Sequence, residues 1–160
     1  MNYLSRLSVV AGIIVMASLG CDSGQREQPA VASPAVASID KRTPVPLPAD
    51  AQQAVLREMR QMLGAVGGAM DAAAKGDTAA VLAAIAPARS AAAADPAIEA
   101  LLPPEWKELA ERTHGGFDSL AVAVSRTHGP AALKDTVLTH LARVSGSCTS
   151  CHETFRVVVR

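Results

Sequence analysis

A run of five residues near the C-terminus, Cys148-Thr149-Ser150-Cys151-His152, constrains this chain more than any other feature, because it has the pattern C-x-x-C-H. On a helix, two thiols three positions apart lie about one turn from each other on the same side. Each thiol can then bond to one vinyl group of the same porphyrin, while the adjacent imidazole reaches the iron. The spacing therefore predicts a covalently attached c-type haem, held by Cys148 and Cys151, with His152 as an iron ligand.

Two other chemistries use cysteines at this spacing. A thioredoxin-like redox pair requires the motif at the start of a helix in a βαβ unit, whereas here it follows a helical pattern with no predicted strand before it. A zinc site requires about four ligands, for which His140 would have to join the three motif residues. Cys151 and His152 are adjacent, however, and are difficult to place on one tetrahedron. Both chemistries remain as alternatives to haem.

The composition favours helices. The chain has 160 residues, of which 49% are hydrophobic but only 2% aromatic, and alanine provides much of the apolar content. Alanine has the highest helix propensity and is depleted in strands. Small side chains fill little volume, so we expect a haem to supply the large apolar body that the sequence lacks and the apoprotein to be loosely packed. The formal net charge is zero, with no cluster of Lys and Arg, so nucleic acid is not an expected partner.

Apolar residues recur every three or four positions in four segments, which predicts four helices. The first is expected to run from an N-cap at Asp50 to residue 76, and the second to continue past a break at Pro87. The third and fourth are expected to start at Pro104 and Pro130. The apolar stripe of the fourth comprises Leu133, Val137, Leu141, Val144, Cys148, Cys151 and Phe155. Short connections between these segments predict an all-α fold, an antiparallel up-down-up-down four-helix bundle.

Two smaller features refine this prediction. Asp77 or Thr78 is expected to cap the second helix. The Gly115-Gly116 pair in the third is expected to let a neighbouring segment approach closely.

Residues 1–20 have the composition of an export signal. Arg6 precedes an apolar run from Leu7 to Leu19, which is too short to span a bilayer and is typical of a signal-peptide core. The overlapping Ser18-Leu19-Gly20-Cys21 is similar to the lipobox of bacterial lipoproteins, whose cysteine becomes acylated. Haem would use the other two cysteines, so acylation explains an otherwise unpaired Cys21. We expect a periplasmic protein anchored to the membrane through lipidated Cys21, with an ordinary cleavable signal as the alternative.

Residues 21–48 are rich in Pro, Ala, Ser and Val and show no helical period. This composition predicts an extended, semi-rigid tether. The tether would hold a folded domain, expected at residues 49–160, away from the membrane. A disordered tail is the alternative.

The segment from Val144 to Arg156 resembles the last helix of the cytochrome c-prime family. That family carries an aromatic residue three positions after the motif histidine and an arginine one position later, as Phe155 and Arg156 are here. Lys75-Gly76-Asp77, at the end of the first predicted helix, is also similar. The resemblance implies a four-helix bundle with haem near one end, His152 as the proximal ligand and Arg156 beside it. On a continuous helix, Arg156 would lie one turn beyond His152.

The resemblance also implies that the first helix covers the other face of the haem. In that family the covering residue is either apolar, which leaves the iron five-coordinate, or a methionine. Met59 and Met62 both lie in the expected window on the apolar stripe. Either methionine, no protein ligand at all, or His114 on the third helix remains an option. A methionine at helical spacing is also ordinary core filler.

The remaining basic residues offer weaker signals. His128 and His140 are expected at the surface. Arg57 and Arg60 are candidates for pairing with haem propionates, although solvated charges on a helix are the common outcome.

The sixth ligand decides which function is expected. A thioether there blocks exogenous ligands and favours electron exchange with redox partner proteins, whereas an open apolar pocket admits NO or CO. The first hypothesis is a monohaem electron carrier, the second a five-coordinate gas-binding cytochrome, and the third a haem-free structural or metal-binding lipoprotein. We find no catalytic dyad or triad and do not expect an enzyme. The resemblance further implies a homodimer through the first two helices.

Overall fold

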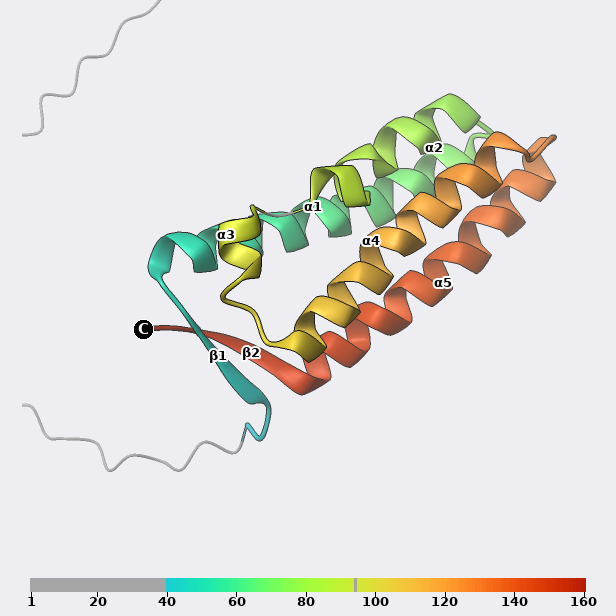
Figure 1. Ribbon diagram of the computed structural model, residues 1–160. Helices are drawn as coiled ribbons and strands as arrows, with labels where there is room; N and C mark the ends of the chain where they lie inside the picture. The colour runs from blue at the N-terminus through green and yellow to red at the C-terminus, as the bar shows by residue number, and fades with distance from the viewer. Residues whose placement is uncertain (1–39, 94) are drawn as a thin grey trace, which may run out of the picture. The chain divides into compact units, whose positions relative to one another are not determined.

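The computed structural model describes residues 40–93 and 95–160, which contain five α-helices, two short 3₁₀ turns and a two-stranded sheet. In chain order the elements are β1 Thr43–Leu47, α1 Ala49–Ala74, α2 Thr78–Ile85, η1 Ala86–Ala88, η2 Ser90–Ala92, α3 Pro96–Glu99, α4 Pro104–Ser125, α5 Pro130–Thr154 and β2 Phe155–Val159. The mostly helical content confirms the helical part of the predicted fold class, and Figure 1 shows the long helices packed together. The export signal, Cys21 and most of the predicted tether lie outside the described residues. Of the helices that the structure describes, none combines the length and apolar content that a bilayer crossing requires.

Helix α1 begins slightly earlier than the sequence pattern predicts. Pro48 is its N-cap, so the predicted N-cap role of Asp50 is wrong. Asp50 lies instead in the first turn, where its Oδ1 accepts a hydrogen bond from the Ala51 amide at 2.9 Å. Its negative charge there interacts favourably with the positive end of the helix dipole. The predicted end is confirmed, because Gly76 adopts a φ of +72°, a left-handed conformation that glycine tolerates without strain.

Asp77 caps α2, because its Oδ1 accepts a hydrogen bond from the Ala80 amide at 2.9 Å. The predicted continuation of this helix beyond Pro87 is wrong. The chain forms the 3₁₀ turns η1 and η2 there instead, since proline lacks an amide donor and its ring clashes with the preceding helical turn.

Helices α4 and α5 start at Pro104 and Pro130, which confirms both predictions. They approach closely at Gly116, where a Cβ atom would lie 2.6 Å from Val144 Cγ2 of α5. A Cβ atom on Gly115 would meet no atom within 4 Å. Only the second glycine of the pair is therefore required for packing, along the seam where Figure 1 shows α4 and α5 side by side.

The sequence analysis missed the two strands, which pair in parallel. Thr43 lies opposite Phe155 and Leu47 opposite Val159. Val45 and Leu47 are 1% and 0% exposed, because alternate side chains of a strand point to the same face. The prediction of a tether reaching residue 48 is therefore wrong for its last residues, which belong to the folded domain. In Figure 1 the strands lie together where α5 ends.

The core consists of two hydrophobic clusters. The strand cluster brings β1 and β2 onto the first turns of α1 and α4, and its buried residues are Val45, Leu47, Ala51, Val55, Trp106, Leu109 and Phe155. The helical cluster joins α1, α2, α4 and α5, and its largest buried side chains include Ile85, Phe117, Leu120, Leu133 and Leu141. Alanine supplies much of the rest of the helical cluster, as the composition suggests.

Candidate functional site

The C-x-x-C-H motif lies near the end of α5, where the two clusters meet. Cys148 is half-buried and packs against the helical cluster, whereas Cys151, one turn later, packs against the strand cluster. His152 is exposed. The helical spacing therefore presents both thiols to the core, one to each cluster.

Both thiols are free, and their surroundings disfavour thiolate chemistry. Burial raises the pKa of Cys148 and raises the pKa of Cys151 to about 11. Redox-active cysteines have lowered pKa values, often at a helix N-terminus, where the dipole stabilises the thiolate. Here the motif lies near the C-terminus of its helix, so the thioredoxin-like alternative is not supported.

Motif residues line three pockets in the described part of the chain, and a fourth pocket shares other lining residues with these three. The main pocket, about 420 Å³, lies between α1 and α5 and is lined by Cys148 and His152. The inner pocket, about 60 Å³, adds Cys151 to these two residues. The strand pocket, about 110 Å³, lies beside Cys151, His152 and Phe155. The side pocket, about 210 Å³, lies between α1, α4 and the segment through η2 and α3.

Two methionines of α1 connect these pockets. Met59 lines all four, and Met62 lines the main, inner and side pockets. Both are half-buried, and they divide between the clusters as the cysteines do, Met59 with the strand cluster and Met62 with the helical cluster. Trp106 of α4 lines three of the pockets, a contribution that the sequence analysis missed. The structure thus brings both candidate sixth ligands to the pockets that the motif lines.

The lining of the main pocket fits a large apolar cofactor. Its volume falls within the range of about 300–1,000 Å³ that is usual for such sites. Most of its lining is apolar, and the polar members besides Cys148 and His152 are Arg60, Ser145 and Thr149. Two thiols and one imidazole are the donors that covalent haem binding requires. The donor set and the pocket are therefore consistent with the predicted haem.

Comparison with known proteins leaves the site to be interpreted from its own geometry. No family model, curated protein or solved structure matches this chain. Within residues 40–93 and 95–160, no three His, Cys, Asp or Glu side chains gather closely enough to hold a metal ion. The zinc alternative therefore has no ligand set in the described part of the chain.

Arg156 does not lie where the helical pattern places it. Helix α5 ends at Thr154, and the extended backbone of Phe155 leads into β2, so Arg156 pairs with Pro44 instead of lying one turn beyond His152. The run of β-branched valines that follows favours a strand over a helix. Arg156 Nε is buried and lies 4.0 Å from Asp40 Oδ2, too far for a hydrogen bond. Arg156 lines none of the four pockets.

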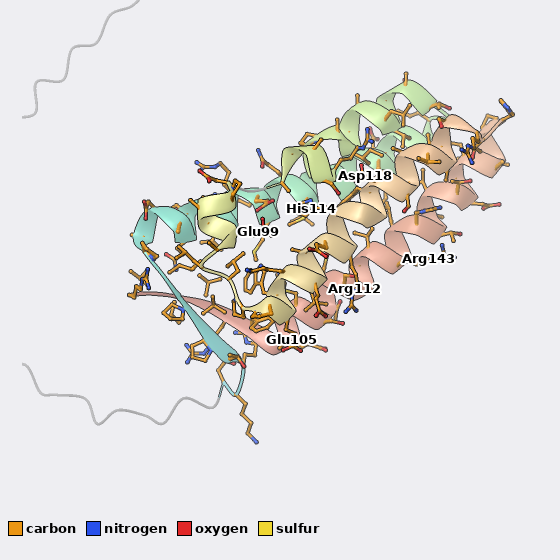
Figure 2. The ribbon with its side chains drawn as sticks, viewed as in Figure 1. Glu99, Glu105, Arg112, His114, Asp118 and Arg143 are labelled. Atoms are coloured by element: carbon orange, nitrogen blue, oxygen red, sulfur yellow. The ribbon has the colours of Figure 1, made fainter. Side chains whose placement is uncertain are left out.

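Both imidazole nitrogens of His114 are engaged, so the alternative in which it ligates iron is not supported. Nδ1 lies 2.8 Å from the Ala88 carbonyl oxygen, and Nε2 lies 3.2 Å from Glu58 Oε1, an ionic contact without the alignment of a hydrogen bond. The Glu58 carboxylate raises the pKa of His114, and burial opposes this shift. One turn later, Asp118 accepts a hydrogen bond from Arg89 at 2.6 Å. The contacts of His114 with Ala88 and of Asp118 with Arg89 hold the η1–η2 segment against α4. Figure 2 labels His114 and Asp118 on α4.

The other basic candidates divide between the pocket and the surface. Arg60 lines the main pocket, whereas Arg57 is exposed. His128 is exposed in the connection between α4 and α5, and His140 is half-buried on α5. Neither histidine lines any of the four pockets.

Arg42, which the sequence analysis also missed, reaches the motif from the segment before β1. Its Nη1 donates a hydrogen bond to the His152 carbonyl oxygen at 3.2 Å. Asp40 accepts from Nε and Nη2 of the same guanidinium at 2.9 and 2.7 Å. These hydrogen bonds from Arg42 lower the pKa of Asp40 to about 2, so the carboxylate stays ionised at neutral pH. Arg42 also lines the strand pocket with Cys151 and His152.

Proposed function

We propose that this protein is a monohaem c-type cytochrome that transfers electrons, with haem held covalently by Cys148 and Cys151 and with His152 as an iron ligand. One observation carries the proposal: two thiols and an imidazole from one helical turn line adjoining pockets, all three of which Met59 also lines and two of which Met62 lines. The bound group would supply a reversible one-electron couple.

The residues of α1 would set the chemistry of the distal face. Met59 is the preferred sixth ligand because it lines every one of the four pockets, and Met62 is the second candidate. A thioether ligand raises the reduction potential and occupies the position that an exogenous ligand would need. The apolar side chains around it, among them Leu56 and Val66, would exclude water from the site.

A five-coordinate site that binds NO or CO is the second candidate function. One observation favours it: Met59 and Met62 line the side pocket of about 210 Å³. If both methionines serve as core filler, a small uncharged gas would have space next to the site.

The proposal includes an antiparallel up-down-up-down arrangement of α1, α2, α4 and α5. Contacts of α1 with α2, of α2 with α4, of α4 with α5 and of α5 with α1 support it. Such a ring of neighbours is typical of a four-helix bundle with short connections.

The optical spectrum of the mature protein, oxidised, reduced and reduced with CO, tests the two functions. A low-spin spectrum that CO leaves unchanged supports the electron carrier, and Met59→Ala should then bind CO while Met62→Ala should not. A high-spin spectrum that shifts fully with CO supports gas binding instead. Haem that acid-acetone extraction removes contradicts covalent attachment through Cys148 and Cys151. No haem at all contradicts both functions and favours the haem-free lipoprotein.

We further propose that the protein is periplasmic and anchored through acylated Cys21, as the lipobox-like sequence predicts. Mass spectrometry of the N-terminal peptide should find a lipid on Cys21. Cys21→Ser should move the protein from the membrane fraction to the soluble fraction. A wild-type protein that is already soluble and unmodified contradicts the anchor and leaves the haem proposal standing.

A further inference from the structure

The carbonyl of His152 lies in the last turn of α5, where no amide of the same helix is available to donate a hydrogen bond to it. Helix α5 stops two residues later, and the last carbonyls of a helix have no intrahelical partner. The Phe155 amide donates to the Cys151 carbonyl. The His152 carbonyl accepts instead from Arg42 Nη1 at 3.2 Å, across 110 residues of sequence. The helical turn that carries His152 is thus held by a hydrogen bond from a side chain near the N-terminal end of the folded domain.

Arg42 is held in place more firmly than an ordinary surface arginine. The Asp40 carboxylate accepts hydrogen bonds from two nitrogens of the Arg42 guanidinium and a third from the Arg42 backbone amide at 3.1 Å. The next residue, Thr43, begins β1 and pairs with Phe155 in β2. The side chain and the backbone of Arg42 are therefore both fixed before the hydrogen bond to His152 forms. This lowers the conformational entropy that is lost when that bond forms.

The same contacts concentrate charge beside the motif. Arg42 and Arg156 contribute two positive charges, and Asp40 contributes one negative charge within 4.0 Å of both. Arg42 lines the strand pocket together with Cys151 and His152. A positive charge near a redox centre favours the reduced form, which carries one positive charge fewer.

We propose that Arg42 is a positioning residue of the site: it fixes the carbonyl end of the His152 turn and holds a positive charge there that raises the reduction potential. This inference rests on the proposed haem function. It assigns to the segment before β1 a part in tuning the site, through contacts one step removed from the iron ligand.

Two substitutions that break the same ion pair should have opposite effects on the midpoint potential of the mature protein. Arg42→Met removes a positive charge and should lower the potential. Asp40→Asn removes a negative charge, leaves both arginines and should raise it. Lys41→Met, a control with the same charge change on a neighbour for which no hydrogen bond to His152 is seen, should shift the potential by less than Arg42→Met does.

The opposite signs separate an electrostatic role from a merely structural one. If Arg42 only braced the fold, both substitutions would shift the potential in the same direction or not at all, and either result overturns the inference. If Arg42→Met does not accumulate, Asp40→Asn still decides, because its potential must rise. A wild-type protein without covalent haem would refute the proposed function itself, a result that is distinct from unchanged potentials in haem-loaded variants.

Discussion

His114 and Glu58 form a buried polar contact that ties three elements together. Among the described residues, the buried polar side chains are Thr113 and His114. Thr113 satisfies its hydroxyl within its own helix, on the Leu109 carbonyl at 2.8 Å. His114 of α4 instead contacts Glu58 on α1 and Ala88 in η1. Its charge should therefore influence the stability of the whole domain.

We expect this contact to make stability depend on pH. The folded state raises the pKa of His114 above its ordinary value of 6.5, mainly through Glu58 and further through the Ala88 carbonyl and Asp118, while burial opposes the shift. The stabilisation is therefore fully present below about pH 6.5 and is lost as the pH rises through the folded-state pKa. His114→Gln should abolish this pH dependence. It should also lower the free energy of unfolding by about 1–3 kcal/mol at pH 6, because it leaves Glu58 without its cation.

Urea unfolding of both proteins between pH 5 and 9 measures this effect. The difference in free energy of unfolding between wild type and His114→Gln should shrink as the pH rises. His128→Gln changes an exposed histidine and should give a constant difference near zero. A difference for His114→Gln that does not vary with pH would mean that folding does not shift the pKa of His114, and would contradict this account.

At the scale of elements, the contact between α4 and α5 depends on a single missing side chain. Gly116→Ala would place a Cβ atom 2.6 Å from Val144 Cγ2, so the Val144 side chain must rotate or the helices must separate, at a cost of about 1–3 kcal/mol. Gly115→Ala is the matched control, because its Cβ atom meets nothing within 4 Å. It should instead stabilise the helix by up to about 1 kcal/mol. Denaturant midpoints that fall for both variants would contradict this account of the seam.

The strand β1 should contribute to stability although it follows a proline-rich segment. Leu47 is fully buried in the strand cluster, and Leu47→Ala should cost about 2–5 kcal/mol in free energy of unfolding. Thr43→Ala, at an exposed position of the same strand, should change stability by less than about 0.5 kcal/mol. Equal small effects from both substitutions would mean that β1 packs only loosely in solution.

Local sequence signals predicted the helices, but they could not predict pairing between distant segments. The cap at Asp77 and the stop at Gly76 are properties of a few neighbouring residues, and the structure confirms both. The strands require segments more than 100 residues apart to meet. A period of two at Val45 and Leu47 was a usable signal for β1, but the surrounding prolines favoured the interpretation as a tether.

The candidate site shows the same division. Helical periodicity placed the motif cysteines and the two methionines on the apolar faces of α5 and α1. The family resemblance, not periodicity, made the methionines candidate ligands. Arg42 could not be predicted, because it reaches His152 only after β1 has paired with β2. Arg156 was misplaced because periodicity extends a helix until a stop signal appears. The β-branched run at Val157–Val159 was the only such signal.

At the scale of the whole molecule, the two clusters leave space between them at the motif. The pockets there are lined from both sides, by Cys148 and Met62 with one cluster and by Cys151 and Met59 with the other. A group that filled this space would join the clusters into one core, since side chains that face a void have no atoms on that side to attract them.

Removing both motif thiols should therefore loosen the protein if they hold the proposed haem. The variant with Cys148→Ala and Cys151→Ala should lose covalent haem, show a lower unfolding midpoint and bind the dye ANS, while it keeps most of its helical circular dichroism. Ser150→Ala, an exposed residue between the two cysteines, should match the wild type in all three measurements. A double variant as stable as the wild type would show that the core is complete without the cofactor.

Pairing β1 with β2 also fixes an order of events during folding. The pairing closes a loop of about 110 residues, and contacts so distant in sequence form later than local ones such as those between α4 and α5. The helical turn with both thiols can therefore form while Arg42 is still far from His152. We expect the thiols to stay reachable during that interval and the strands to close the site only afterwards. Any change that slows the meeting of the strands would then lengthen the time available for attachment.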